Sequence, residues 1–328
     1  MARARREPAS ADFVEVARGL ILRWWLVPAV AVAADLLWGE PPARVHPVVW
    51  MGRLIAALER RAPDGSSARL LYGAGMVAAC LVAFTVPAWL LEQTLRRCGP
   101  AGAVLLGVCL KPAFAVRELL RATARVQTAL RNDDLASARA GLRSLVSRDT
   151  ANLTAPLLAA AAIESVAENC SDSVVAPLLY YGLWGLPGAV AYRVINTLDA
   201  MVGYRNQRYE HLGKAAARID DLANVVPARL TGLLLVAAAP LADGLSASAW
   251  RSMWRDHGLT ASPNAGWPIS AAAGALGVTL EKAGHYRLNV TGRQPDAIDV
   301  GRAVVLIRSA LMLGAPLPLA LFRLRRKG

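Results

Sequence analysis

The stretch 70-LLYGAGMVAACLVAFTVPAWLL-91 contains twenty-two consecutive residues without a charged side chain. The hydrocarbon core of a bilayer is about 30 Å thick. An α-helix rises about 1.5 Å per residue, so a helix of this length would cross that core. Hydrophobic residues make up 55% of the 328-residue chain, which exceeds the usual share of a soluble globular domain. The sequence therefore predicts an integral membrane protein.

Other apolar runs lie on both sides of this segment. The run 173–195 is long enough to span, but its centre reads GLWGLPG, a turn sequence that favours a re-entrant or buried helical hairpin. No alternation typical of strands occurs. We expect an all-α, polytopic membrane protein with about four to six embedded segments, drawn from the runs 20–38, 70–91, 101–116, 173–195, 230–242 and 303–322. A polar break is expected at 92–100, and an amphipathic helical pair with a break near Asn132 at 117–148.

The domain organisation follows from these runs. Residues 1–19 form a charged N-terminal extension, 20–322 a single membrane-embedded catalytic domain, and 323–328 a basic tail. The formal net charge of +13 fits contact with anionic lipid or with polyanionic small molecules. A nucleic-acid partner is not expected, because the basic residues are scattered and no reading motif accompanies them. We expect a multi-pass protein of the cell (inner) membrane.

An acidic stripe, 164-ESVAENCSD-172, follows Arg148-Asp149 and precedes the predicted hairpin. In a helix, Glu164, Glu168 and Asp172 fall at i, i+4 and i+8, so three carboxylates share one face. Like charges repel, and apolar surroundings increase that cost. The stripe therefore predicts one wall of a site that also contains a cation, a metal ion or water, with salt bridges to Arg as the alternative.

Two further polar clusters follow the hairpin. In 196-NTLDAMVGYRNQRY-209, Asn196 and Asp199 share a helical face, and Gly203 is expected to end that helix. In 211-HLGKAAARIDDLANVVPARL-230, Asp220 and Asn224 are four residues apart, and the adjacent Asp221 points to another face. The basic residues of these clusters are suited to phosphate groups: Arg205, Arg208, Lys214, Arg218 and Arg229.

Two loop segments complete the set of polar clusters. The stretch 35-DLLWGEPPARVHPVVWMG-52 contains His46, and its prolines keep the loop extended. In 262-SPNAGWP-268, Asn264 lies in a turn that leads into a helix of small residues. Carboxylates and amides at this density suit Mg²⁺, which prefers oxygen ligands. A P-loop, an HExxH zinc motif and a GxSxG elbow do not occur in the sequence.

At these clusters the chain resembles the adenosylcobinamide-phosphate synthase family, integral membrane enzymes of cobalamin biosynthesis. The resemblance rests on five stretches in the family's order: Asp35 to Gly52, Glu164 to Asp172, Asn196 to Tyr204, Ala217 to Arg229, and Ser262 to Pro268. It implies ATP-dependent amide synthesis, with ATP and Mg²⁺ as cofactors. The carboxylate of adenosylcobyric acid is joined to the amine of (R)-1-amino-2-propanol phosphate or ethanolamine phosphate. Contact with other corrinoid-pathway enzymes is a further expectation.

Residue roles are assigned on this basis as hypotheses. The candidate catalytic residues are Glu164, Glu168, Asp172, Asp220 and Asp221, and the candidate Mg²⁺ ligands are Glu168, Asp172 and Asp221. The candidate substrate- and phosphate-binding residues are His46, Asn169, Asn196, Asp199, Tyr204, Arg205, Arg208, Lys214, Arg218, Asn224, Arg229 and Asn264.

Other functions remain open on the sequence alone. Intramembrane carboxylates and a broken hairpin are also typical of a membrane transporter. A membrane alcohol phosphotransferase would use paired aspartates, but its DGxxAR…GxxxD signature does not occur. A non-catalytic scaffold for corrinoid enzymes would not require so many acids in apolar surroundings.

Overall fold

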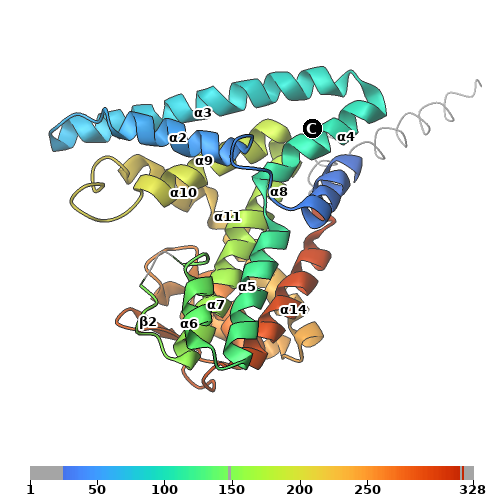
Figure 1. The fold of residues 1–328 in the computed structure, drawn as a ribbon, viewed down its shortest axis with the longest axis vertical. Helices are drawn as coiled ribbons and strands as arrows, with labels where there is room; N and C mark the ends of the chain where they lie inside the picture. Colours follow the sequence, from blue (N-terminus) through green and yellow to red (C-terminus); the bar gives the residue numbers. More distant parts are fainter. Residues whose placement is uncertain (1–24, 147–148, 318–319, 321–328) are drawn as a thin grey trace, which may run out of the picture.

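The computed structural model describes residues 25–146, 149–317 and 320. The described chain is predominantly helical and has two parts (Figure 1). One long helix, α3, crosses the top of the molecule with shorter helices beside it, and a bundle extends away from this layer. The predicted 1–19 extension, the 323–328 tail, residues 20–24 of the first apolar run and Arg148 lie outside the described residues.

The upper layer is built on apolar side chains from segments far apart in the sequence. Met51 and Ile55 of α2 pack with Met76 of α3 and Leu198 of α9 in one buried cluster. The layer contains α2 (Pro47–Glu59), α3 (Ser66–Arg96), α4 (Gly99–Leu110), α8 (Ala176–Trp184), α9 (Leu186–Val202) and α10 (Lys214–Ala223).

The bundle has its own core, in which small residues allow close helix packing. Every residue of α13 is buried, and a Cβ on Gly274 would lie 2.5 Å from the backbone oxygen of Ser248 in α12. The bundle contains α5 (Val116–Arg131), α6 (Leu135–Leu142), α7 (Ala155–Cys170), α11 (Val225–Ala238), α12 (Ser246–Asp256), α13 (Gly266–Leu276) and α14 (Ala297–Gly314). Short helices η1 (Lys111–Ala113), η2 (Ser171–Val175), η3 (Ala239–Ala242) and η4 (His257–Leu259) join these elements.

The fold is predominantly helical, as expected, but it also contains one short β-hairpin. Strands β1 (Leu280–Lys282) and β2 (Tyr286–Leu288) form an antiparallel hairpin in which Leu280 pairs with Leu288. Both leucines are fully buried against the bundle. With only three residues per strand, the hairpin carries too short an alternation to be recognised in the sequence.

Two helices of the described chain are long and apolar enough to cross a membrane: Ser66–Arg96 and Val225–Ala242. The first contains the predicted run 70–91 and exposes Leu71, Val82 and Trp89, as a lipid-facing helix would. The helix Trp25–Trp38 is apolar but shorter. The larger count of four to six embedded segments therefore stays a prediction.

The turn predicted within 182–188 is found at Gly185, where α8 ends and α9 begins with φ of 75°. The backbone N–H of Leu186 donates to Glu92 Oε2 at 3.1 Å. The predicted polar break at 92–100 is consequently wrong in its position, because Glu92 is buried within α3, which continues to Arg96. Whether the hairpin enters the membrane stays a prediction.

The predicted break near Asn132 agrees with the structure, since α5 ends at Arg131 and α6 begins at Leu135. The helix of the run 101–116 ends at Lys111-Pro112, where α4 gives way to η1. The amphipathic pair corresponds to α5 and α6, and Asp134 caps α6 by accepting a hydrogen bond from Ser137 N at 2.9 Å.

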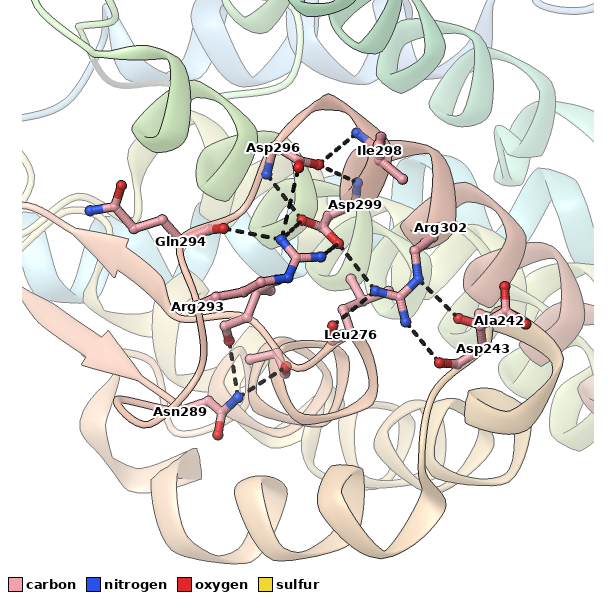
Figure 2. Close-up of polar contacts among 12 residues, drawn as sticks. Ala242, Asp243, Leu276, Asn289, Arg293, Gln294, Asp296, Ile298, Asp299 and Arg302 are labelled. Atoms are coloured by element: carbon pink, nitrogen blue, oxygen red, sulfur yellow. Dashed lines mark hydrogen bonds and ion pairs between the residues drawn. The ribbon is translucent and has the colours of Figure 1, made fainter.

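A buried carboxylate fixes the start of α14 against the bundle (Figure 2). Both nitrogens of the Arg293 fork donate to Asp299 at 2.6 Å, and Arg302 Nη1 donates to it at 3.1 Å. Arg302 also donates to the backbone oxygens of Ala242, Asp243 and Leu276. Arg302, which also pairs with Asp299, therefore ties α14 to the ends of η3 and α13, and α13 follows a turn that lines the candidate site.

Candidate active site

A cavity of about 290 Å³ lies where η2, α9, α10, the start of α11 and the turn before α13 meet. Segments separated by almost one hundred residues contribute to its wall. It brings together nine of the residues singled out in the sequence: Glu168, Asp172, Asn196, Asp199, Arg205, Asp220, Asp221, Asn224 and Asn264. Ser171, Gly203, Ala217, Ala228, Ala261, Ser262, Pro263, Ala265 and Pro268 complete the lining.

The acidic stripe does not form a single face. Glu168 and Asp172 line the cavity, but Glu164 is buried elsewhere and accepts a hydrogen bond from Tyr286 Oη at 2.6 Å. A step of four residues rotates a side chain by about 40° around an α-helix, so Glu164 and Asp172 diverge over two such steps. The helix also widens into a π-helix at Ser171, which changes the direction of Asp172 further.

The end of α9 contributes the next part of the wall. Asn196 and Asp199 both line the cavity, as their spacing predicted, and α9 ends at Gly203 as expected. A Cβ atom at Gly203 would collide with Asp199 Oδ1. The close approach of the Asp199 carboxylate therefore requires glycine at this position.

At the junction of α10 and α11 a hydrogen-bond chain orients one carboxylate. Tyr192 Oη donates to Asn224 Oδ1 at 2.9 Å, and Asn224 Nδ2 donates to Asp220 Oδ2 at 2.9 Å. The second oxygen of Asp220, Oδ1, is buried and has no hydrogen-bond partner of good geometry within the described ranges. The i, i+4 relation between Asp220 and Asn224 is thus confirmed as a direct contact.

The turn at 262–266 holds Asn264 against the backbone carbonyl of Asp221 in α10. Ser262 Oγ accepts from Asn264 N at 3.2 Å, and Asn264 Nδ2 donates to the backbone oxygen of Asp221 at 2.7 Å. Arg229 Nη1 donates to Asn264 Oδ1 at 3.2 Å, and its guanidinium lies over the Trp267 ring. Arg229 therefore positions Asn264 rather than lining the cavity.

Among the described residues that line the cavity, carboxyl groups outnumber cationic side chains. The charged lining residues are Glu168, Asp172, Asp199, Asp220 and Asp221 against Arg205. Burial raises the pKa of Asp220 to about 7, and the Asp199 carboxylate adds to this effect. Burial and the carboxylates of Glu168 and Asp220 raise the pKa of Asp172 well above its ordinary value. Burial and Asp221 raise the pKa of Asp199.

These side chains fit a magnesium ion held partly by substrate. Among the described residues, no three His, Cys, Asp or Glu side chains form a ready-made metal cluster. Mg²⁺ commonly binds through only one or two carboxylates and completes its shell with water and phosphate. The buried, unpartnered Asp220 Oδ1 and the excess of carboxylates are consistent with such a cation.

Comparison with known protein families shows to which family the chain belongs. The family model described as "CobD/Cbib protein" matches residues 28–308. The chain belongs to the CobD/Cbib family.

Relatives in this family match most of the chain. It is 45% identical over 287 residues to a cobalamin biosynthesis protein CobD of Dehalococcoides mccartyi, covering 87% of this chain and 93% of the relative. It is 42% identical over 294 residues to that of Rhodobacter capsulatus, covering 86% and 92%. A probable CobD of Methanothermobacter thermautotrophicus is 40% identical over 270 residues, covering 82% and 87%. No solved structure matches the chain. Family membership gives this chain a biosynthetic role in the cobalamin pathway.

Several residues singled out in the sequence lie outside the cavity of this CobD/Cbib-family chain. His46 caps α2 by accepting from Val48 N, and its Nε2 lies 2.8 Å from Glu40. Asn169 donates to Ser165 O of its own helix at 2.9 Å. Arg208 Nη2 donates to Glu59 at 2.6 Å. Tyr204, Lys214 and Arg218 are exposed and do not belong to the lining.

Arg193 was not among the site residues predicted from the sequence. This residue lies in α9, and its Nη1 donates to Asn196 Oδ1 at 3.2 Å. The available signal was its position three residues before Asn196, which places both on one helical face. Arg193 lies within the apolar run 173–195, which was predicted to form a hairpin, so its charge was not assigned to the site.

Proposed function

We propose that this chain is adenosylcobinamide-phosphate synthase, an ATP-dependent acid–amine ligase of the inner membrane. The reaction joins the free carboxylate of adenosylcobyric acid to the amine of (R)-1-amino-2-propanol phosphate or of ethanolamine phosphate. The observation that carries the proposal is the convergence of the family's acidic and amide residues, from four of its five motif stretches, on one cavity.

The size of the cavity limits what it can hold. A volume of about 290 Å³ suits a phosphorylated amino alcohol or part of a nucleotide. It is too small for a corrin ring, whose reacting carboxylate arm would enter while the ring stays outside. The exposed apolar surface of α3 supports a membrane location, where a bulky amphipathic corrinoid would also be accommodated.

The chemistry requires two activations. At neutral pH a carboxylate and an ammonium do not react with each other, so the carboxylate needs a better leaving group and the amine must lose a proton. We assign the phosphoryl donor to ATP. We assign removal of the amine proton to Asp220, because this carboxyl lines the cavity and burial raises its pKa to about 7, near the working pH that suits a general base.

Magnesium would neutralise phosphate charge in this cavity. Glu168 from the end of α7, Asp172 from η2 and Asp221 from α10 are the candidate ligands, of which one or two would hold the ion together with phosphate and water. Arg205 supplies positive charge in the same lining, and Asn196, Asn224 and Asn264 supply amides that could orient the substrate.

Purified protein in detergent, supplied with adenosylcobyric acid, ATP, Mg²⁺ and an amino-alcohol phosphate, tests the proposal. We expect adenosylcobinamide phosphate and one ADP for each product molecule. Uptake of substrate into sealed vesicles without product formation would instead support the transporter alternative. Using the two amino-alcohol phosphates separately identifies the preferred one.

A further inference from the structure

Arg193 is a charged side chain that the proposed reaction has not used. It extends from α9, and the one hydrogen bond that its side chain makes within the described residues runs from Nη1 to Asn196 Oδ1. Its Nε is buried and has no acceptor among those residues. A guanidinium offers five N–H donors, so most of this donor capacity is unused.

The carboxylates near Arg193 do not satisfy these donors. Among the described residues, the carboxylates whose charge acts on the Arg193 guanidinium are those of Asp172 in η2 and of Glu40 in the loop before α2. Glu40 is already paired with Lys111 Nζ and His46 Nε2, both at 2.8 Å. Asp172 influences Arg193 through charge, but the described structure contains no ion pair between them. Leaving a buried cation without a close counter-charge is costly.

The surroundings of Arg193 connect it to the cavity. Asn196, which accepts its hydrogen bond, lines that cavity, and so does Asp172, whose charge acts on it. Arg205 is the cationic residue of the described lining. An oxyanion in the cavity would therefore lie near one guanidinium in the lining and near a second that contacts Asn196.

We propose that Arg193 and Asn196 form an oxyanion-binding subsite for the phosphate of a substrate. Two sources present this chemistry: the phosphomonoester of the amino alcohol and the phosphate chain of the nucleotide. Arg suits this role better than Lys because its planar fork binds phosphate oxygens in pairs. The subsite rests on the proposed function only for the choice of these two ligands.

Equilibrium binding to the full chain in detergent tests this subsite without turnover, because adenosylcobyric acid is left out. Titration calorimetry would measure ethanolamine phosphate and a non-hydrolysable ATP analogue separately, each with Mg²⁺. We expect Arg193→Gln to lower the affinity for at least one of these two probes by about tenfold or more. The probe that loses affinity identifies the source of the phosphate. Arg125→Gln, which removes an exposed arginine paired with Glu118, is the matched control and should leave both affinities unchanged.

Arg193→Lys keeps the charge and guards against misfolding of the glutamine variant. We expect it to fold and to bind the affected probe at least about threefold more weakly than the wild type. Wild-type affinity for both probes in a folded Arg193→Gln or Arg193→Lys protein would overturn the subsite. So would a wild-type protein that binds neither probe. If binding depends on Arg193 but the complete mixture forms no amide, the proposed reaction fails and the subsite stands.

Discussion

Tyr192 donates its hydroxyl hydrogen to Asn224 Oδ1 at 2.9 Å, and this contact determines which end of the Asn224 amide faces Asp220. With Oδ1 occupied, Nδ2 is directed at the Asp220 carboxylate, where it donates at 2.9 Å. A buried tyrosine on α9 thereby controls the orientation of a carboxylate on α10 through a single amide.

Tyr192→Phe should lower kcat/KM by about threefold to tenfold. The ring is retained, but Asn224 loses the donor that fixes it, and the loss of one buried hydrogen bond is worth about 1 kcal/mol. Tyr180→Phe is the matched control, because Tyr180 stacks on Tyr192 and donates instead to the backbone oxygen of Ala223. Equal effects of the two substitutions on steady-state kinetics would show that orientation of Asn224 is unimportant.

Gly203→Ala should reduce turnover by at least about tenfold while the protein still folds. The added methyl group would occupy the position of Asp199 Oδ1 and displace that carboxylate from the cavity wall. Gly75→Ala provides the comparison, since no atom lies within 4 Å of its Cβ position in α3. Turnover is measured for both variants. Full activity of Gly203→Ala would contradict the placement of Asp199 in the cavity wall.

The stability of metal-free protein should depend on pH through Asp220. Its pKa is raised to about 7 in the folded chain, whereas an unfolded Asp has a pKa near 3.9. The folded state therefore holds this proton more tightly, and its stability falls as pH rises from about 4 to 7. Asn cannot ionise, so the Asp220→Asn variant does not lose this stability as pH rises. The free energy of unfolding of the variant minus that of the wild type should therefore be about 2 kcal/mol larger at pH 8 than at pH 5.

Thermal unfolding in detergent with a chelator measures this difference. Adding Mg²⁺ should raise the midpoint of the wild type more at pH 8 than at pH 5, because the cation binds the ionised carboxylates. An identical pH dependence for Asp220→Asn and wild type would contradict the high pKa.

Asp299→Asn should destabilise the bundle by about 2–4 kcal/mol. Asp299 is fully buried and receives both Arg293 and Arg302, so a neutral replacement leaves these cations without their shared partner. Glu281→Gln, which breaks the exposed pair with Arg287, should cost less than about 1 kcal/mol. Unfolding midpoints that fall equally for both variants would contradict a special role for the network in Figure 2.

The sequence predicted local relationships better than the direction of side chains. Spacing of three or four residues correctly paired Asn196 with Asp199 and Asp220 with Asn224, because helical geometry alone determines these contacts. The same rule failed for Glu164, since rotation accumulates over eight residues and a π-helix begins at Ser171.

Long-range partners could not be predicted from the chain alone. The contact of Arg208 with Glu59 joins residues 149 positions apart, so a basic residue assigned to phosphate instead holds the loop after α9. Glu92 was placed in a loop because it follows an apolar run, but Leu186 N provides its partner within the fold. Both outcomes depend on tertiary packing that spacing does not encode.

The comparison of two neighbouring glutamates tests the central claim most directly. Glu168 lines the cavity, whereas Glu164, one helical turn earlier, contacts Tyr286 outside it. In the amide-forming assay, Glu168→Gln should lower turnover by at least about tenfold, which corresponds to about 1.4 kcal/mol of barrier, and Asp221→Asn should do the same. Glu164→Gln should retain turnover within about threefold of wild type once stability is matched. Wild-type turnover in Glu168→Gln and Asp221→Asn would contradict the assignment of this cavity as the site of amide formation.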